Sequence, residues 1–142
     1  LAKHHNLSFT FSQDINRAND FDIIFTGFVA DNQIKNYYAA ADLVLISSLS
    51  EGEGLNITGF EALYLNILSI TTPGAGISQI FIENQIGLVS SYDPVEYATQ
   101  IKAVISNPAY YEKYIQKGRL YLINNLSVSS YATKIINVYS TI

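Results

Sequence analysis

Short apolar runs, each followed by glycine, proline or polar residues, recur along this chain. Such runs occupy residues 22–26, 43–47, 67–71 and 87–89, and they are typical of buried strands. Residues 7–11 alternate apolar and polar side chains, which indicates a further short strand. The sequence therefore predicts four convincing strands and a weaker one that precedes them.

Apolar residues at helical spacing separate these strands. Residues 32–41 form the first predicted helix, which Asp31 is expected to cap. A second helix opens at Asn56 or Thr58, and a short third helix is expected at 77–83. The inward stripe of the second helix is expected to consist of Ile57, Phe60, Leu63 and Tyr64.

Three further helices are predicted in the carboxy-terminal part, at about 94–142. They span 95–106, 108–125 and 128–139. An Asp-Pro pair at 93–94 and an Asn-Pro pair at 107–108 supply helix-start signals, because proline suits the first helical position. Four tyrosines are expected to pack these helices against the sheet: Tyr110, Tyr111, Tyr114 and Tyr121.

Strands and helices that alternate in this order predict an α/β protein with a parallel sheet and helices on both faces. The 142 residues, of which 49% are hydrophobic, are enough for one domain with one core. A parallel sheet covered on both faces normally contains more than four strands. Because the chain also begins with Leu1, we expect part of a domain that lacks one or two leading βα units.

Charge and composition exclude several classes of function. The net charge is -4 and the basic residues are scattered, so no nucleic-acid-binding surface is indicated. The absence of cysteine rules out disulfides and thiolate metal sites and fits a cytoplasmic protein. No Lys or Arg lies between Lys35 and Lys102, so an anion bound in this stretch relies on backbone N–H groups and a helix dipole.

A glycine-rich, acidic turn joins the strand at 43–47 to the second helix. Gly52 and Gly54 allow the backbone to approach a ligand closely and tolerate positive φ. The helix start beyond them directs unpaired N–H groups at the same place, which makes a phosphate-sized anion site. Since Glu53 and Glu61 would repel a phosphate, they are better suited to accept hydrogen bonds from the hydroxyl groups of ribose or a sugar.

Structural roles for these acids stay open at this point. Glu51 fits a solvated surface position. Glu53, taken on its own, fits a structural role as well as a ligand-binding role. Glu61 lies beside Phe60 and Ala62, which predicts a half-buried acid that requires a partner.

Two other groups of residues do not indicate a catalytic or metal site. The adjacent His4 and His5 point apart on a helix, so they do not suggest a metal site. The serines at 47–50 have no histidine nearby, so no hydrolase triad is available.

The segment from Glu53 to Leu63 resembles the E-x7-E motif of the retaining, GT-B-fold glycosyltransferases of family 4. The resemblance extends over nearly the whole chain from Phe25. Other segments similar to family motifs are 25–29, 34–42, 75–79 and 84–89. The chain departs from the family pattern at four positions, which are Asn66 for Gly, Leu68 for Pro, Ala75 for Gly and Gln79 for an acid. We expect Asn66 to adopt the left-handed conformation in place of glycine.

The resemblance implies a Rossmann-like, carboxy-terminal donor-binding domain, of which residues 1–142 form a part. It implies that Glu53 is the catalytic carboxylate beside the donor sugar, and that Glu61 binds the ribose hydroxyls. The backbone N–H groups that would cradle the sugar and the distal phosphate are those of Gly54, Leu55, Asn56 and Ile57. The residues that would lie along the base are Gly27, Phe28 and Val29.

The resemblance also implies the reaction. A hexosyl group would pass from a UDP-, GDP- or ADP-sugar to an unknown acceptor with retention at the anomeric carbon, and no metal or cofactor would be needed. The family's phosphate-binding Arg and Lys belong to a leading βα unit that follows an acceptor-binding domain, so we expect this chain alone to be inactive. Membrane association, at the inner face, is expected only for the full-length protein.

Two alternatives remain at this stage. One is a GT-B-like binding or chaperone subunit that no longer transfers sugar. The other is a nucleotide-sugar epimerase of similar fold. The presence of both Glu53 and Glu61 favours the transferase.

Overall fold

The computed structural model describes residues 7–14, 16–17, 20–49 and 54–141 of the chain. It divides into two compact units, Leu1–Ala41 and Asp42–Ile142. Each unit has its own strands and helices and is described by itself.

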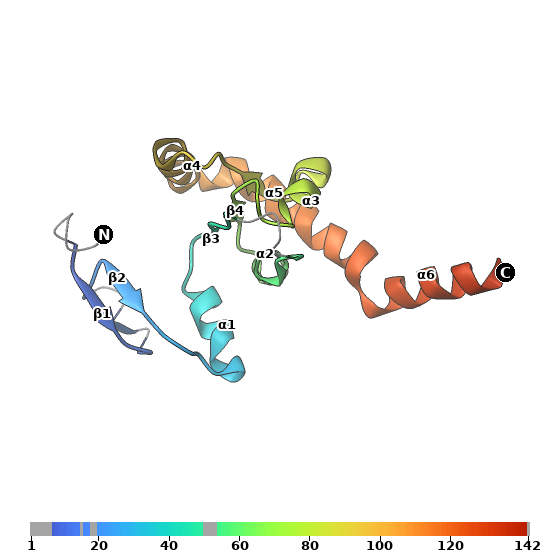
Figure 1. Ribbon diagram of the computed structural model, residues 1–142, viewed down its shortest axis with the longest axis horizontal. Helices are drawn as coiled ribbons and strands as arrows, with labels where there is room; N and C mark the ends of the chain where they lie inside the picture. Colours follow the sequence, from blue (N-terminus) through green and yellow to red (C-terminus); the bar gives the residue numbers. More distant parts are fainter. Residues whose placement is uncertain (1–6, 15, 18–19, 50–53, 142) are drawn as a thin grey trace. The chain divides into compact units, whose positions relative to one another are not determined.

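Within its described residues, the first unit contains two parallel strands and one α-helix. Strands β1 (Phe9–Phe11) and β2 (Ile23–Phe25) pair with Phe9 opposite Ile23, and they lie side by side in Figure 1. The rings of Phe11 and Phe25 stack with centroids 5.2 Å apart, and Phe9 meets both rings edge-on. Aromatic side chains thus hold together a strand pair that is too short to be stable on hydrogen bonds alone.

Ser8 and Asp22 join the two strands at their amino-terminal ends. The backbone N–H and the hydroxyl of Ser8 both donate to Oδ2 of Asp22, at 2.8 and 2.7 Å. The N–H of Asp22 in turn donates to Oγ of Ser8 at 3.0 Å. Hydrogen bonds from the hydroxyl and N–H of Ser8 lower the pKa of the Asp22 carboxyl, because they favour its charged form.

Helix α1 (Asp31–Ala39) begins one residue earlier than expected. Its cap is Ala30, which makes no side-chain hydrogen bond to the helix. The predicted capping by Asp31 is therefore wrong. Asp31 is instead the first helical residue, where its negative charge interacts favourably with the helix dipole.

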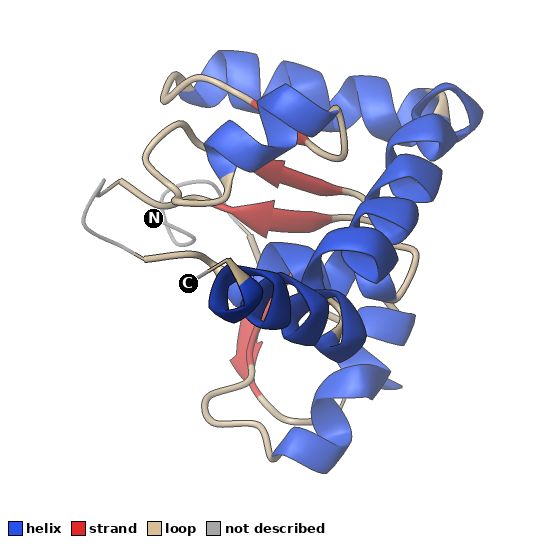
Figure 2. Ribbon diagram, turned by 90° about the vertical axis from the view of Figure 1, so that its right-hand side faces the viewer, coloured by secondary structure: helices blue, strands red, loops and turns tan. Residues whose placement is uncertain are grey.

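The second unit is an α/β structure, as predicted. Strands β3 (Val44–Ile46), β4 (Ser69–Thr71) and β5 (Leu88–Val89) form a parallel sheet in that order. Helices lie on both sides of the parallel strands in Figure 2. They are α2 (Ile57–Tyr64), α3 (Ser78–Asn84), α4 (Pro94–Ser106) and α5 (Pro108–Tyr121), whereas α6 (Val128–Ser140), at the end of the chain, has no buried residue.

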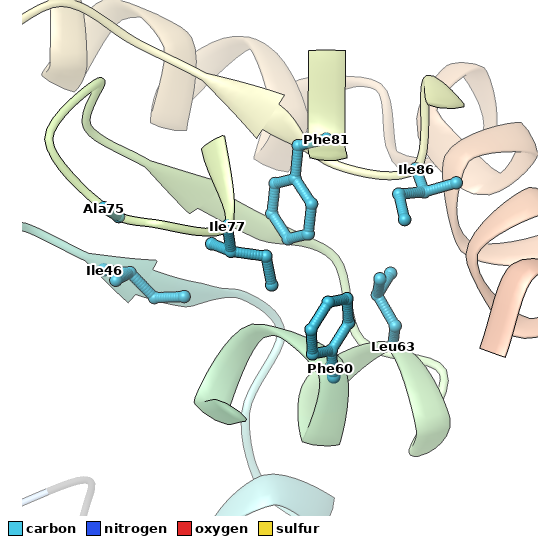
Figure 3. Packing of buried hydrophobic residues seen from close by; sticks show 7 residues of the cluster. All are labelled: Ile46, Phe60, Leu63, Ala75, Ile77, Phe81 and Ile86. Atoms are coloured by element: carbon cyan, nitrogen blue, oxygen red, sulfur yellow. The ribbon is translucent and has the colours of Figure 1, made fainter. Parts of the chain in front are cut away.

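One face of this sheet is covered by α2 and α3. The apolar cluster on this face is labelled in Figure 3 and consists of Ile46, Phe60, Leu63, Ala75, Ile77, Phe81 and Ile86. Phe81 is fully buried and points toward Phe60 across the space between the two helices (Figure 3). Gly59 lets α2 pack closely against Ile77. A Cβ at this position would lie only 2.6 Å from Cδ1 of Ile77.

The predicted stripe of α2 is half right. Phe60 and Leu63 are buried, but Ile57 and Tyr64 are 66% and 72% exposed. The buried face of α2 also includes the small residues Gly59 and Ala62. Their small size lets the helix pack close to the sheet.

The other face of the sheet is covered by α4 and α5. Its buried cluster is Leu68, Ile70, Leu88 and Val104. Tyr97 packs against this cluster, and its hydroxyl donates to the carbonyl of Ile70 at 3.0 Å. Burial raises the pKa of Tyr97, since the charged phenolate is disfavoured away from water.

The carboxy-terminal helices follow the predicted order with one break. A π-helical segment, η3 (Leu122–Leu126), separates α5 from α6 and ends the helix predicted at 108–125 four residues early. Tyr111 and Tyr114 pack on the face covered by α4 and α5, and Tyr121 packs on the opposite face. The prediction for Tyr110 is wrong, because its side chain is 55% exposed.

Three local signals in the second unit are confirmed. Asp93 caps α4 by accepting from the N–H groups of Val95 and Glu96 at 2.7 and 3.1 Å. Asn107 caps α5, which begins at Pro108. Asn66 has a φ of 63°, so it takes the left-handed conformation that follows α2.

Gly87 is a position where an added methyl group should be costly. A Cβ at this residue would lie 2.2 Å from the ring of Phe81, which is fully buried. We expect Gly87→Ala to lower the free energy of unfolding by about 1–3 kcal/mol, measured by urea denaturation.

Gly54→Ala is the matched control, because a Cβ there meets nothing within 4 Å. The packing assigned to Phe81 would be wrong if both variants unfolded at the same urea concentration.

The Asp22 carboxylate should make the stability of the first unit depend on pH. A lowered pKa means that its contribution is complete above the unfolded value, about 3.9, and is lost as the pH falls through the folded value. The difference in unfolding free energy between wild type and Asp22→Asn should therefore be constant from pH 7 to pH 5 and shrink in more acidic solution. A difference that stays constant down to pH 2 would contradict this role.

Candidate functional site

A polar hollow lies where β3 ends and α2 begins. Its volume is about 290 Å³, and its lining consists of Leu45, Ile46, Ser47, Ser48, Asn56 and Thr58. The carboxyl ends of parallel strands are where α/β proteins bind ligands. Hydroxyl and amide groups dominate the polar part of this lining, so the hollow is suited to a ligand that carries hydroxyl groups.

Asn56 is the N-cap of α2 and so determines where the helix begins. It has an extended backbone, and its side-chain oxygen accepts from the N–H of Thr58 at 3.1 Å. The cap uses one of the N–H groups that the first turn of a helix leaves unpaired. An anion at this helix start must therefore be bound by the other N–H groups of the turn.

Thr71, the last residue of β4, and Thr72, which follows it, fix the exit of β3. The N–H of Thr72 donates to the carbonyl of Ile46 at 3.1 Å, and the hydroxyl of Thr71 donates to the same carbonyl at 3.3 Å. The hydroxyl of Thr72 donates to the carbonyl of Ser48. Ser48 and Thr72 are both buried, whereas Ser47 between the two bonded carbonyls is exposed and lines the hollow.

The predicted donor-binding residues at 54–57 lie at this edge of the sheet. Gly54, Leu55 and Ile57 are exposed, and Asn56 is half-buried. Gly54 does not have a positive φ, although glycine tolerates one. A Cβ at this position would meet no atom within 4 Å. Of these four residues, Asn56 is the one whose side chain lines the hollow.

Glu61 lies on the outward face of α2, one turn beyond Ile57. Its side chain is exposed, so the prediction of a half-buried acid is wrong. The physical reason is the close packing at Gly59, which turns Phe60 and Ala62 inward and Glu61 outward. A carboxylate in this position is accessible to a ligand that lies along the amino-terminal half of the helix.

Glu53, the predicted catalytic carboxylate, lies outside the described residues, as do Glu51 and Gly52. Its role stays a prediction from the sequence.

Gly27, Phe28 and Val29 belong to the first unit. Gly27 has a φ of 62°, a left-handed conformation that favours glycine. Phe28 is 83% exposed, and its carbonyl accepts a hydrogen bond from the side-chain amide of Gln13. Their predicted place along a nucleotide base stays a prediction.

Three polar residues of the hollow were not predicted as site residues: Ser47, Ser48 and Thr58. The available signal was a set of hydroxyl side chains on both sides of the acidic turn. Serine and threonine are common in turns for purely local reasons, so this signal by itself does not indicate a site.

Metal and membrane features can be assessed for the described residues alone. Within these ranges, no three His, Cys, Asp or Glu side chains are grouped so that they could hold a metal ion. No helix in the same part of the chain has the length and apolar character needed to cross a bilayer.

Solved structures with the same fold come from glycosyltransferases. The carboxy-terminal domain of the glycosyl transferase group 1 family protein LpcC from Francisella tularensis is 26% identical, with a TM-score of 0.65, over 82% of this chain and 60% of that one. Sucrose-phosphate synthase from Thermosynechococcus elongatus is 20% identical, with a TM-score of 0.70, over 89% of this chain and 31% of that one.

The carboxy-terminal CMP-Kdo binding domain of WaaA from Acinetobacter baumannii is a third structure with this fold. It is 19% identical, with a TM-score of 0.62, over 85% of this chain and 64% of that one. The present chain thus spans less than two thirds of each of these three chains. No curated protein matches it.

The fold is therefore that of the carboxy-terminal half of a GT-B glycosyltransferase, with a parallel sheet between helical layers. The family model described as glycosyl transferases group 1 matches residues 12–121, which cover a part of each unit and contain the hollow. This chain belongs to the glycosyl transferases group 1 family.

Proposed function

We propose that this chain is the donor-binding portion of a retaining, metal-independent glycosyltransferase. Its donor is a UDP-, GDP- or ADP-sugar, and its acceptor is bound by an amino-terminal domain. The observation that carries the proposal is a hydroxyl-lined hollow where β3 ends and α2 begins, with the exposed carboxylate of Glu61 one turn farther along α2, in a chain of this family.

The dimensions of the hollow support a partial role in donor binding. A volume of about 290 Å³ lies just below the usual range for sites that enclose a whole ligand. It is sufficient for one ring of a nucleotide-sugar. The side chains of Ser47, Asn56 and Thr58 supply the donors and acceptors that a ring with several hydroxyl groups requires.

The start of α2 supports a place for the diphosphate. N–H groups of the first helical turn and the helix dipole favour negative charge, including the charge that develops on a leaving diphosphate. Glu61 lies one turn farther along the outward face, where it can accept from ribose hydroxyls without facing the phosphates. Glu53 would act at the sugar.

Glu61→Ala should weaken binding of the nucleotide whose ribose it holds. The loss of a charge-assisted hydrogen bond corresponds to about 1–3 kcal/mol, or roughly 5- to 150-fold in Kd. Titration calorimetry of the full-length protein with UDP, GDP and ADP would measure this effect. The titrations are performed in EDTA, where a metal-independent site should bind with undiminished affinity.

Glu112→Ala is the matched control, because Glu112 is also an exposed helical glutamate but lies in α5. Equal affinities for wild type and Glu61→Ala would remove Glu61 from the ribose. If the wild-type protein bound none of the nucleotides, the transferase proposal would be refuted.

Glu53→Gln should affect turnover more than binding. A carboxylate beside the sugar stabilises the positive charge of an oxocarbenium-like transition state, which the bound ground state lacks. We expect kcat to fall by about 100-fold or more, with less than a threefold change in nucleotide Kd. Equal losses in the two quantities would argue against a place for Glu53 at the reacting carbon.

A further inference from the structure

We infer that Thr72 is a positioning residue for the donor site. Its hydroxyl holds the exit of β3 in the conformation that presents Ser47 to the hollow. The positional part of this inference rests on the hydrogen bonds of the second unit. Its consequence for ligand binding rests on the proposed function.

The first step concerns where the pairing of β3 with β4 ends. The last aligned residues are Ile46 and Thr71, and the N–H of Thr72 still donates to the carbonyl of Ile46. Beyond this point the chain leaves the sheet, and backbone pairing of the parallel ladder stops. The hydroxyl of Thr72 then donates to the carbonyl of Ser48 and extends the connection by two residues.

The second step concerns burial. Ser48 is 7% exposed and Thr72 is 4% exposed, so water has little access to the groups that they contribute. A buried carbonyl that loses a hydrogen bond to a fixed side chain is held less firmly in its position. Removal of the Thr72 hydroxyl should therefore loosen the backbone at Ser48.

The third step connects this bond to the hollow. The bonded carbonyls of Ile46 and Ser48 fix the residues on either side of Ser47. Ser47 is thereby directed outward, to the same hollow as Asn56 and Thr58 of the opposite wall. A shift at Ser48 would move one wall relative to the other.

Thr72 is suited to this role by shape as well as by chemistry. Its branched side chain fits a strand end, and its hydroxyl is the donor that the buried carbonyl requires. Valine has nearly the same shape but no donor, and serine keeps the donor without the methyl group. These two substitutions therefore separate the hydrogen bond from packing.

The positional claim can be tested without a ligand by amide hydrogen exchange of the 142-residue chain, read by NMR. In Thr72→Val, the amides of Ile46 and of residue 72 should exchange about tenfold faster after correction for intrinsic rates, which equals about 1.4 kcal/mol of local opening. Amides in the middle of β4 should change by less than about threefold. In Thr72→Ser, all of these amides should keep wild-type rates.

Ser78→Ala provides a matched control. The hydroxyl of Ser78 also donates to a backbone carbonyl, but its acceptor is Pro73, at 2.8 Å, and not a carbonyl of β3 or its exit. Faster exchange at Ile46 in this control, or wild-type exchange there in Thr72→Val, would overturn the positional claim.

The functional consequence is measured with the nucleotide that the wild-type full-length protein binds most tightly. Thr72→Val should raise the Kd about tenfold, whereas Thr72→Ser and Ser78→Ala should stay within about threefold. Faster exchange in Thr72→Val with unchanged affinity would separate Thr72 from ligand binding and refute the inference. If the wild type bound no nucleotide, the proposed function would fail, while the exchange rates would still decide whether Thr72 positions the exit of β3.

Discussion

The candidate site depends on how closely α2 packs against the sheet. At Gly59 the helix has no side chain, and a Cβ there would lie 2.6 Å from Cδ1 of Ile77. The helix consequently rests directly on the apolar layer between it and the strands (Figure 3). This contact fixes where the helix begins, because Asn56 caps it three residues before Gly59. The wall of the hollow that Asn56 and Thr58 provide is therefore positioned by a contact in the core.

Strand β4 and the segment after it position both walls of the hollow, the one at Ser47 and the one at Asn56 and Thr58. All three of its residues are buried, and the hydroxyl of Tyr97 holds the carbonyl of Ile70 from the opposite face. The segment that follows β4 contributes Thr72 to the exit of β3 and Ile77 to the packing of α2. The two walls come from different parts of the chain, but each is fixed by this one strand and its continuation. A central strand buried on both sides is the least deformable element available for this purpose.

Local signals predicted this fold better than they predicted the surfaces of its helices. The behaviour of Asn66 and Asp93 depends on their own backbone and side chain, so the sequence was sufficient for both. The stripe of α2 depends on what the helix meets, and a small residue next to Phe60 rotated Ile57 out of the core. In the candidate site, the sequence predicted the sheet edge and the helix start. It did not predict the wall at Ser47, because that wall depends on a hydrogen bond to a residue 24 positions away from Ser48.

The distribution of charge limits what the second unit can contribute to a donor site. The sequence has no Lys or Arg between Lys35 and Lys102, and this interval contains the hollow and all of α2. The cap at Asn56 further reduces the N–H groups that an anion can use. This edge of the sheet can form hydrogen bonds with the hydroxyl groups of a ligand. It cannot balance two phosphates, because their charge exceeds what one helix start can neutralise. In the proposed function, recognition of the sugar and ribose therefore belongs to this edge of the sheet, and neutralisation of the diphosphate requires cationic side chains from outside residues 36–101.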